Sequence, residues 1–140
     1  VSARAGEPML KPGRWHHLAG VYDGEAVALY VDGRRVASEK GADPRRTNAL
    51  PLYIGADPNG RGDPMSFFDG LIDEVRISRN ARYSESFTPA RRHEPDDQTL
   101  LLLHLDRGLG VFVPDAGPAG HHAIAPNGLD YLALETTDKR

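Results

Sequence analysis

The 140-residue chain contains no cysteine, which excludes disulfide bonds and thiolate metal sites. This absence does not exclude secretion, because a core of adequate size is stable without disulfides. Long apolar runs are also missing: the leucine run at residues 100–103 has four residues and is far too short to cross a bilayer. The net charge of -3 supplies no cationic field of the kind that holds nucleic acid. We therefore expect neither membrane insertion nor nucleic-acid binding.

The remaining composition is that of an ordinary globular domain, with 39% apolar and 26% charged residues. The length suffices for one domain with a core, although it is small for a complete β-sandwich. Glycine (15 residues) and proline (11 residues) are plentiful but not periodic, which is typical of many turns rather than of collagen or disorder. The composition favours one small domain rich in turns.

The clearest pattern lies in residues 14–36, which read RWHHLAGVYDGEAVALYVDGRRV. Two alternating runs flank an Asp23-Gly24 turn, and an Asp32-Gly33 turn follows the second run. Successive side chains of a strand point to opposite faces, and Asp-Gly readily takes the positive φ angles of a two-residue hairpin turn. The stretch therefore predicts an amphipathic β-hairpin, in which Trp15 and Tyr30 fill the core.

The segment after the hairpin alternates between loop and strand signals. Residues 37–51 combine charge with glycine and proline and predict a loop between sheets. Residues 52–56 predict a short strand. Residues 57–66, DPNGRGDPMS, are the most turn-rich stretch of the chain and predict a surface loop.

The second half of the chain begins with another alternating run. Residues 71–78 predict a strand that places Asp73 among aliphatic side chains, as a partly buried carboxylate with hydrogen-bonding partners. Residues 84–87 predict a single helical turn capped by Ser84. Residues 91–98 are charged and predict a linker, whereas residues 99–106, TLLLLHLD, predict a buried strand. The last five residues predict a frayed tail.

Two blocks of sequence, in a fixed order, carry a family resemblance. The first is WHHLAGVYDG at residues 15–24 with LYVDG at residues 29–33, and the second is LYIGAD at residues 52–57 with FFDGLIDEVRIS at residues 67–78. Together they resemble the laminin-G-like, concanavalin A-like lectin family. The resemblance covers residues 12–90, which would be the C-terminal half of such a domain. It implies an all-β antiparallel sandwich of the jelly-roll type, partial or rearranged.

The domain organisation has two interpretations. Residues 101–110 and 115–123 resemble the opening of a laminin-G-like domain. Either the chain spans parts of two tandem domains, or the leucine strand completes the sheet of the first part, because chain ends in sandwiches often lie close together. We favour the second, with residues 1–98 as the C-terminal half of the sandwich and residues 99–140 completing its sheet.

No signal peptide is recognisable in the opening residues VSARAGEP. Because of the family resemblance, we expect the sequence to begin inside a domain, with any signal peptide upstream of it. The resemblance implies a protein that is secreted or located in the cell envelope.

Glycoside hydrolysis is the first enzymatic activity to consider, since many enzymes share this sandwich fold. It needs two carboxylates about 5–10 Å apart. The related glucanases carry them on one strand as ExDxxE, and in the corresponding stretch only Asp73 matches, because Leu71 and Arg76 replace the glutamates. Adjacent Asp73 and Glu74 would point to opposite faces of a strand. We therefore expect no catalytic residues and no enzyme.

Calcium is the more plausible inorganic partner, because it takes about six to eight oxygen ligands that are usually gathered on loops. In the related pentraxins the loop after the equivalent of residues 52–56 supplies calcium ligands. The resemblance implies that Asp57 lies at or next to a ligand position, and Asn59 and Asp63 join it by membership of the same loop. The alternative is ordinary turn chemistry, since Asp-Pro and Asn-Gly are common in turns.

Other short motifs carry weaker signals. The pairs His16-His17 and His121-His122 lack the spacing of a zinc site and indicate exposed or hydrogen-bonded histidines. The tripeptide Arg61-Gly62-Asp63 is of the integrin-binding type, but three-residue motifs arise often by chance.

Phe67 and Phe68, beside the turn-rich loop, are the best candidates for an exposed aromatic platform that stacks on sugar, with packing in the core as the alternative. We expect a non-catalytic extracellular binding and adhesion module, with carbohydrate as the leading ligand class and calcium as the candidate cofactor. Its partner would be a glycan, an extracellular protein or another domain of the same parent protein. The alternatives are a ligand-free structural accessory domain and, third, a glycoside hydrolase, which a second carboxylate within reach of Asp73 would favour.

Overall fold

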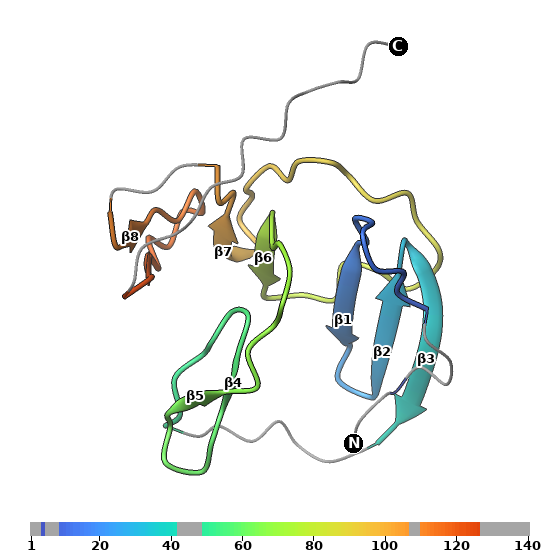
Figure 1. Cartoon of the computed structure of the whole chain (residues 1–140). Coiled ribbons are helices and arrows are strands. Elements are labelled where there is room, and N and C mark those ends of the chain that lie inside the picture. The colour runs from blue at the N-terminus through green and yellow to red at the C-terminus, as the bar shows by residue number, and fades with distance from the viewer. Residues whose placement is uncertain (1–3, 5–8, 42–48, 107–109, 127–140) are drawn as a thin grey trace. The chain divides into compact units, whose positions relative to one another are not determined.

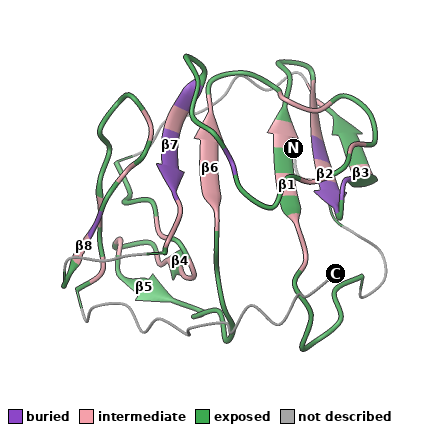
Figure 2. Ribbon diagram, turned by 90° about the horizontal axis from the view of Figure 1, so that it is seen from above, coloured by how far each residue is buried: buried purple, intermediate pink, exposed green. Residues whose placement is uncertain are grey.

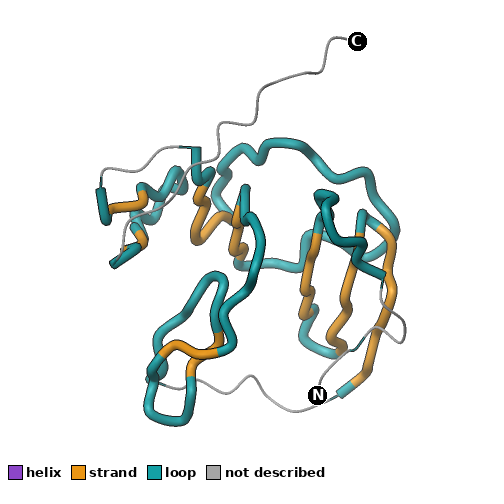
Figure 3. The backbone as a smooth tube through the Cα atoms, viewed as in Figure 1, coloured by secondary structure: helices purple, strands orange, loops and turns teal. Residues whose placement is uncertain are grey.

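The structure, a computed structural model, describes residues 4, 9–41, 49–106 and 110–126. Within these residues it contains nine short strands and no helix (Figures 1 and 3). Every strand pairing is antiparallel. The predicted all-β antiparallel fold class is therefore confirmed. The predicted helical turn at residues 84–87 is wrong, because this segment is a bend without helical hydrogen bonds.

The chain divides into two compact units, which are described separately below. Unit 1 comprises Val1–Leu71 and Asn80–Arg91, and unit 2 comprises Ile72–Arg79 and Arg92–Arg140. In the described part of the chain, no helix is long and apolar enough to cross a membrane.

Unit 1 is built on a three-stranded sheet in the order β1-β2-β3, formed by β1 (Leu18–Tyr22), β2 (Ala26–Val31) and β3 (Arg34–Lys40). The predicted hairpin is thus present, and a third strand extends it. The expectation of a loop from residue 37 is wrong, because β3 continues to Lys40 past a bulge between Leu29 and Tyr30 of β2.

The two turns of this sheet differ. Asp32 and Gly33 have φ values of 50° and 76°, and Val31 pairs with Arg34, which is the two-residue turn expected of Asp-Gly. In the first turn only Gly24 has a positive φ, of 102°. The Asp23 carboxylate instead accepts the N–H groups of Glu25 and Ala26, at 2.9 and 2.7 Å, and so closes the turn from its first position.

The core of unit 1 lies on one face of this sheet. Tyr30 is 1% exposed, and it packs with Tyr83 and Phe87, whose rings stack 3.6 Å apart. The ring of His17 meets the Phe87 ring edge-on at 5.5 Å. The core position predicted for Tyr30 is correct. The one predicted for Trp15 is wrong, because Trp15 precedes β1 and is 54% exposed.

Residues 49–71 of unit 1 form a different structure from the one predicted. Residues 52–56 are not a strand, and Leu52 is 71% exposed. The turn-rich segment that follows is a small hairpin of β4 (Asp57–Pro58) and β5 (Pro64–Met65). The predicted surface loop is therefore on the surface but ordered by strand pairing.

Unit 2 is built on β6 (Val75–Ser78) and β7 (Thr99–Leu103), which pair with each other, and on the pair β8 (Phe112–Val113) and β9 (Ala123–Ile124). The leucine strand is buried as predicted, with Leu102 and Leu103 at 0% and 1% exposure (Figure 2). Leu101 and Leu103 form the core with Val113.

Strand β6 is shorter than the predicted run of residues 71–78, because Glu74 has a φ of 53° and interrupts the extended backbone. The segment predicted as a linker, residues 91–98, is irregular yet buries His93, which is 6% exposed. The predicted tail lies outside the described residues. The predicted domain boundary at residue 98 stays a prediction, although the leucine strand does pair with an earlier strand of the chain.

Candidate functional site

The β4–β5 hairpin carries the three predicted calcium ligands. The side chain of Asn59 organises the tip: its Oδ1 accepts the N–H groups of Arg61 and Asp63, at 2.8 and 3.0 Å, and its Nδ2 donates to Asp63 Oδ2 at 3.0 Å. Asp57 and Asp63 are exposed. In the described structure, neither joins two further Asp, Glu or His side chains whose ligand atoms lie within 4.8 Å of one another. Asn59 thus serves as the cap of a turn that presents two exposed carboxylates.

The predicted aromatic platform follows this hairpin directly. Phe67 and Phe68 are 72% and 58% exposed, so neither packs in a core. The Phe68 N–H donates to the Gly55 carbonyl at 2.8 Å, which ties the segment to the residues before the hairpin. Gly70 leaves room for the Phe68 ring, since a Cβ there would come within 2.6 Å of ring atom Cε1. The two rings are held on an ordered backbone and face solvent.

Unit 2 holds a carboxylate cluster that the sequence did not predict. One oxygen each of Asp73, Glu74 and Asp106 lie within 4.8 Å of one another. The expectation that Asp73 and Glu74 point to opposite faces is wrong, because the positive φ of Glu74 breaks the alternation of a strand. A second carboxylate therefore lies within reach of Asp73.

Glu74, not Asp73, is the buried member of this cluster, with its side chain 11% exposed. Glu74 Oε1 accepts from His104 Nδ1 at 2.7 Å and from Arg92 Nη1 at 3.5 Å, while Oε2 accepts the His93 N–H at 2.8 Å. Arg92 Nη1 also donates to Asp106 Oδ2 at 2.7 Å. Because both oxygens of Glu74 are engaged, this carboxylate ties three segments of the unit together.

The electrostatics of the cluster distinguish its members. Burial raises the pKa of Asp73, and the negative charges of Glu74 and Asp106 raise it further, against the lowering effect of the Glu74 N–H and of Arg92. Its hydrogen bond to Asp106 raises the pKa of Arg92. The arrangement combines one carboxyl group that retains its proton more readily than usual with the Asp106 carboxylate, which is paired with Arg92.

The proximity of these side chains can be inferred only once the pairing of β6 with β7 is known. Glu74 immediately precedes β6 and His104 immediately follows β7, and the antiparallel register pairs Val75 with Leu103. These two ends therefore meet, 30 positions apart in sequence. The alternation of its own strand singles out Asp73 in the sequence, whereas no local pattern connects Asp73 with Arg92, His104 or Asp106.

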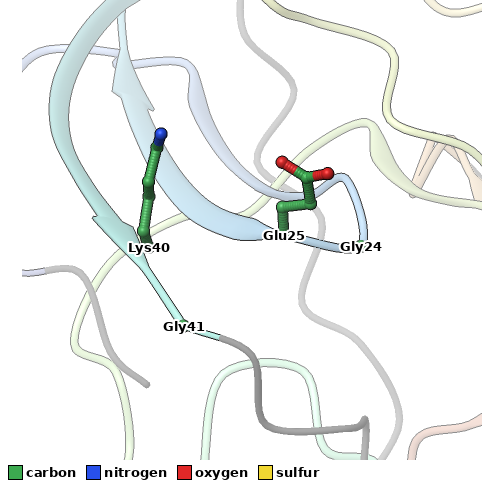
Figure 4. Close-up of a pocket in the computed structure, with 4 residues that line it drawn as sticks. All are labelled: Gly24, Glu25, Lys40 and Gly41. Carbon is green, nitrogen blue, oxygen red and sulfur yellow. The ribbon is translucent and has the colours of Figure 1, made fainter.

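Two open hollows lie on the surface of unit 1. One, at the β1–β2 turn, is lined by Gly24, Glu25, Lys40 and Gly41, and the side chains of Glu25 and of Lys40, at the end of β3, point in the same direction (Figure 4). The other lies between the β2–β3 turn and residues 85–88. The first hollow has one acidic and one basic side chain besides two glycines, while the second is lined by several charged and hydroxyl-bearing side chains.

Three of the four paired histidines, His16, His121 and His122, use ring nitrogens in hydrogen bonds. His16 Nδ1 donates to Asp32 Oδ2 at 2.9 Å, and its Nε2 accepts the Lys11 N–H at 2.9 Å. His122 Nδ1 accepts the Asp115 N–H at 3.0 Å, and His121 Nδ1 donates to the Leu100 carbonyl at 2.9 Å. Each of these three rings joins two segments of the chain by hydrogen bonds, as predicted for these histidines.

Comparison with known proteins identifies the fold family. The family described as the concanavalin A-like lectin/glucanases superfamily, in its Laminin_G_3 form, matches residues 2–86. The match lies in the N-terminal part of this chain, and it does not support the expectation that the similarity is mainly to the C-terminal half of the family's domain. No curated protein and no solved structure is significantly similar to this chain. The chain belongs, through the part that carries β1 to β6, to the concanavalin A-like lectin/glucanases superfamily.

Proposed function

We propose that this protein is a non-catalytic binding module whose leading ligand class is carbohydrate. The observation that carries the proposal is the exposure of two adjacent aromatic rings, Phe67 and Phe68, at 72% and 58%. The family supports a binding role, because it suggests a binding module without specifying its ligand. Exposed aromatic rings on an ordered segment are candidates for ligand contact, since large apolar side chains gain most when a partner covers them.

The chemistry of the platform fits a sugar. The flat apolar face of a pyranose ring can cover an aromatic ring, while its hydroxyl groups reach for polar neighbours. Asp57, Asn59 and Asp63 lie on the hairpin that precedes the rings, and the first and last of them present exposed carboxylates. An aromatic platform beside an acidic loop is the combination that favours binding over a purely structural role.

The test is a titration of the ¹⁵N-labelled chain with neutral oligosaccharides of glucose, xylose and mannose, read at the amides of Phe67, Phe68 and Asp69. We expect saturable shifts for at least one oligosaccharide. The double variant F67A/F68A should weaken binding at these amides at least about tenfold. The matched control Tyr22→Ala removes another exposed aromatic ring, on β1, and should leave binding unchanged. Absence of saturable shifts with every oligosaccharide would refute the proposal.

We propose calcium as the cofactor of this surface, with Asp57 and Asp63 as the ligands and Asn59 as the residue that holds the turn between them. The two exposed carboxylates offer the hard oxygen ligands that calcium prefers. Thermal unfolding with millimolar calcium and with EDTA tests this, because a ligand that binds only the native state raises the midpoint. We expect a rise that is lost in Asp57→Ala and retained in Asp69→Ala, a nearby aspartate outside the hairpin. A midpoint indifferent to calcium would contradict this assignment.

The context of the module is a further part of the proposal. A carbohydrate-binding role fits a secreted or cell-envelope protein in which a glycan, an extracellular protein or another domain of the parent protein is the partner. Protease protection of the tagged protein in intact producer cells tests the location, since a surface module is cleaved from outside.

A glycoside hydrolase is the second candidate, because the structure places Asp73 within reach of two other carboxylates. The raised pKa of Asp73 suits a general acid, which must hold its proton until the leaving group takes it. Against it, Glu74 already accepts from three donors, and Asp106 is paired with Arg92. Release of reducing ends from an oligosaccharide, abolished in Asp73→Asn, would establish this reading. A ligand-free structural domain remains if the chain neither binds nor cleaves any member of the panel.

A further inference from the structure

The larger hollow of unit 1 has the chemistry of a second ligand site. Its lining comes from two segments, Asp32 with Arg34 and Arg35 at the β2–β3 turn, and residues 85–88. The two segments are joined by the Phe87 N–H, which donates to the Gly33 carbonyl at 2.9 Å. Gly33 is required at this junction, because a Cβ there would overlap the Phe87 carbonyl oxygen. The walls of the hollow are therefore set by backbone contact.

Asp32 supplies a fixed hydrogen-bond acceptor in this hollow. Its Oδ1 accepts the His17 N–H and its Oδ2 accepts from His16 Nδ1, both at 2.9 Å. The hydrogen bond from His16, followed by that from the His17 N–H, lowers the pKa of Asp32 and keeps the carboxylate ionised. Each oxygen retains a second lone pair, so the group can accept from a ligand without turning.

The hydrogen-bond donors of the hollow are the guanidinium groups of two arginines. Within the described residues, the guanidinium groups of Arg34 and Arg35 make no hydrogen bond and no ion pair, and both residues are exposed. Glu85, Ser86 and Thr88 complete the polar lining with one carboxylate and two hydroxyl groups. The lining thus balances two positive charges against two negative ones.

This balance selects the class of ligand. The carboxylates of Asp32 and Glu85 would repel an anionic ligand, and the two arginines would repel a cationic one. Because the charges of the lining sum to zero, neither kind of ligand gains net electrostatic attraction. A hydroxyl group donates one hydrogen and accepts through its lone pairs, so it can pair with a carboxylate and a guanidinium at once. We propose that this hollow binds a neutral, hydroxyl-rich ligand, a neutral oligosaccharide, as a site additional to the Phe67–Phe68 platform. The inference rests on the proposed carbohydrate ligand class but not on that platform.

The test uses the full ¹⁵N-labelled chain and reads the amides of Gly33 and Phe87. The probes are neutral oligosaccharides of glucose, xylose and mannose, with a galacturonate oligosaccharide as the acidic counterpart. We expect saturable shifts at these two amides with a neutral probe. The double variant R34M/R35M keeps the apolar stems and should weaken the binding at least about tenfold, because hydrogen bonds to charged groups are among the stronger ones. The variant F67A/F68A should leave it within about twofold, as expected for independent sites.

A variant that changes the net charge of the lining tests whether this charge selects a neutral ligand. Glu85→Gln removes one negative charge from an exposed position and should make the hollow accept the galacturonate probe, which the parent chain should bind at least about tenfold more weakly than the neutral one. Unfolding midpoints equal to that of the parent chain show that the variants fold. Shifts confined to the amides of the Phe67–Phe68 platform, or unaffected by R34M/R35M, would overturn this site and leave the proposed function standing. Absence of shifts anywhere would overturn both.

Discussion

Glu74 and His104 form a largely buried hydrogen-bonded pair, with 2.7 Å between Glu74 Oε1 and His104 Nδ1, although 30 positions separate them in the sequence. Their side chains are only 11% and 20% exposed. The pair exists because β6 begins directly after Glu74 and β7 ends directly before His104, and the two strands run antiparallel. Glu74 thereby closes the open end of this two-stranded sheet.

Removal of the Glu74 carboxylate should destabilise the protein strongly. In Glu74→Ala, His104 Nδ1 and the His93 N–H lose their acceptor, and each buried donor left without a partner costs about 1–3 kcal/mol. The free energy of unfolding in urea measures this cost. Glu85→Ala is the matched control, since Glu85 is exposed and should change stability by less than about 0.5 kcal/mol. Equal losses in the two variants would show that the pair does not stabilise the fold.

Asp115 should make stability depend on pH. Burial alone would raise the pKa of Asp115, but the N–H groups of Leu102, Gly117 and His121, at 2.7–2.8 Å, together outweigh it and lower the pKa below the ordinary 3.8. A folded-state pKa below the unfolded one means that the carboxylate stabilises the protein above about pH 4 and loses this effect as the pH falls through the folded value.

The variant Asp115→Asn isolates this contribution. At neutral pH it should cost about 2 kcal/mol, because one acceptor oxygen becomes an amide group that faces a backbone donor. Urea unfolding of both proteins between pH 7 and pH 3 measures the difference, which should stay constant at first and shrink at the acid end. A difference that grows towards low pH would contradict the sign of the shift.

Gly33 should tolerate no side chain. Its φ of 76° costs an L-residue about 1–2 kcal/mol, and a Cβ would in addition overlap the Phe87 carbonyl oxygen. Gly24 is the matched control, since it also has a positive φ but has no atom within 4 Å of an added Cβ. We expect Gly33→Ala to lose more stability than Gly24→Ala, as measured by the unfolding midpoint. Similar midpoints would show that residues 85–88 are not anchored on the β2–β3 turn.

Leucine substitutions should separate the core from the exposed segment. Leu103 is 1% exposed and lies in the core of unit 2, whereas Leu52 is 71% exposed in unit 1. Leu103→Ala should cost about 2–5 kcal/mol through lost burial and a cavity, while Leu52→Ala should cost less than about 0.5 kcal/mol. Urea unfolding measures both. A large loss in Leu52→Ala would mean that residues 52–56 are packed against an apolar neighbour.

The elements that local chemistry determines were predictable from the sequence. The β1–β2 hairpin follows from alternation, and Asp32-Gly33 takes the positive φ angles that its residue types favour. The leucine strand β7 follows from its apolar content. The family resemblance, placed on motifs of the same region, agrees with the match over residues 2–86.

The elements that tertiary contacts determine were not predictable. Residues 52–56 alternate like a strand, yet Tyr53 donates its hydroxyl to the Gly62 carbonyl and the segment has no strand partner in the described structure. A positive φ at Glu74 is costly for a side chain of this kind, and three donors from distant segments hold it there. Periodicity carries no information about such contacts, so the carboxylate cluster of unit 2 escaped prediction.

The proposed function requires that the protein binds carbohydrate and leaves it intact. The most direct measurement is one titration of the ¹⁵N-labelled chain with the neutral oligosaccharide panel, followed by chromatography of the ligand recovered from the same sample. We expect saturable amide shifts at Phe67 and Phe68 and full recovery of uncleaved oligosaccharide. Absence of saturable shifts across the panel, or recovery of shortened chains, would contradict it.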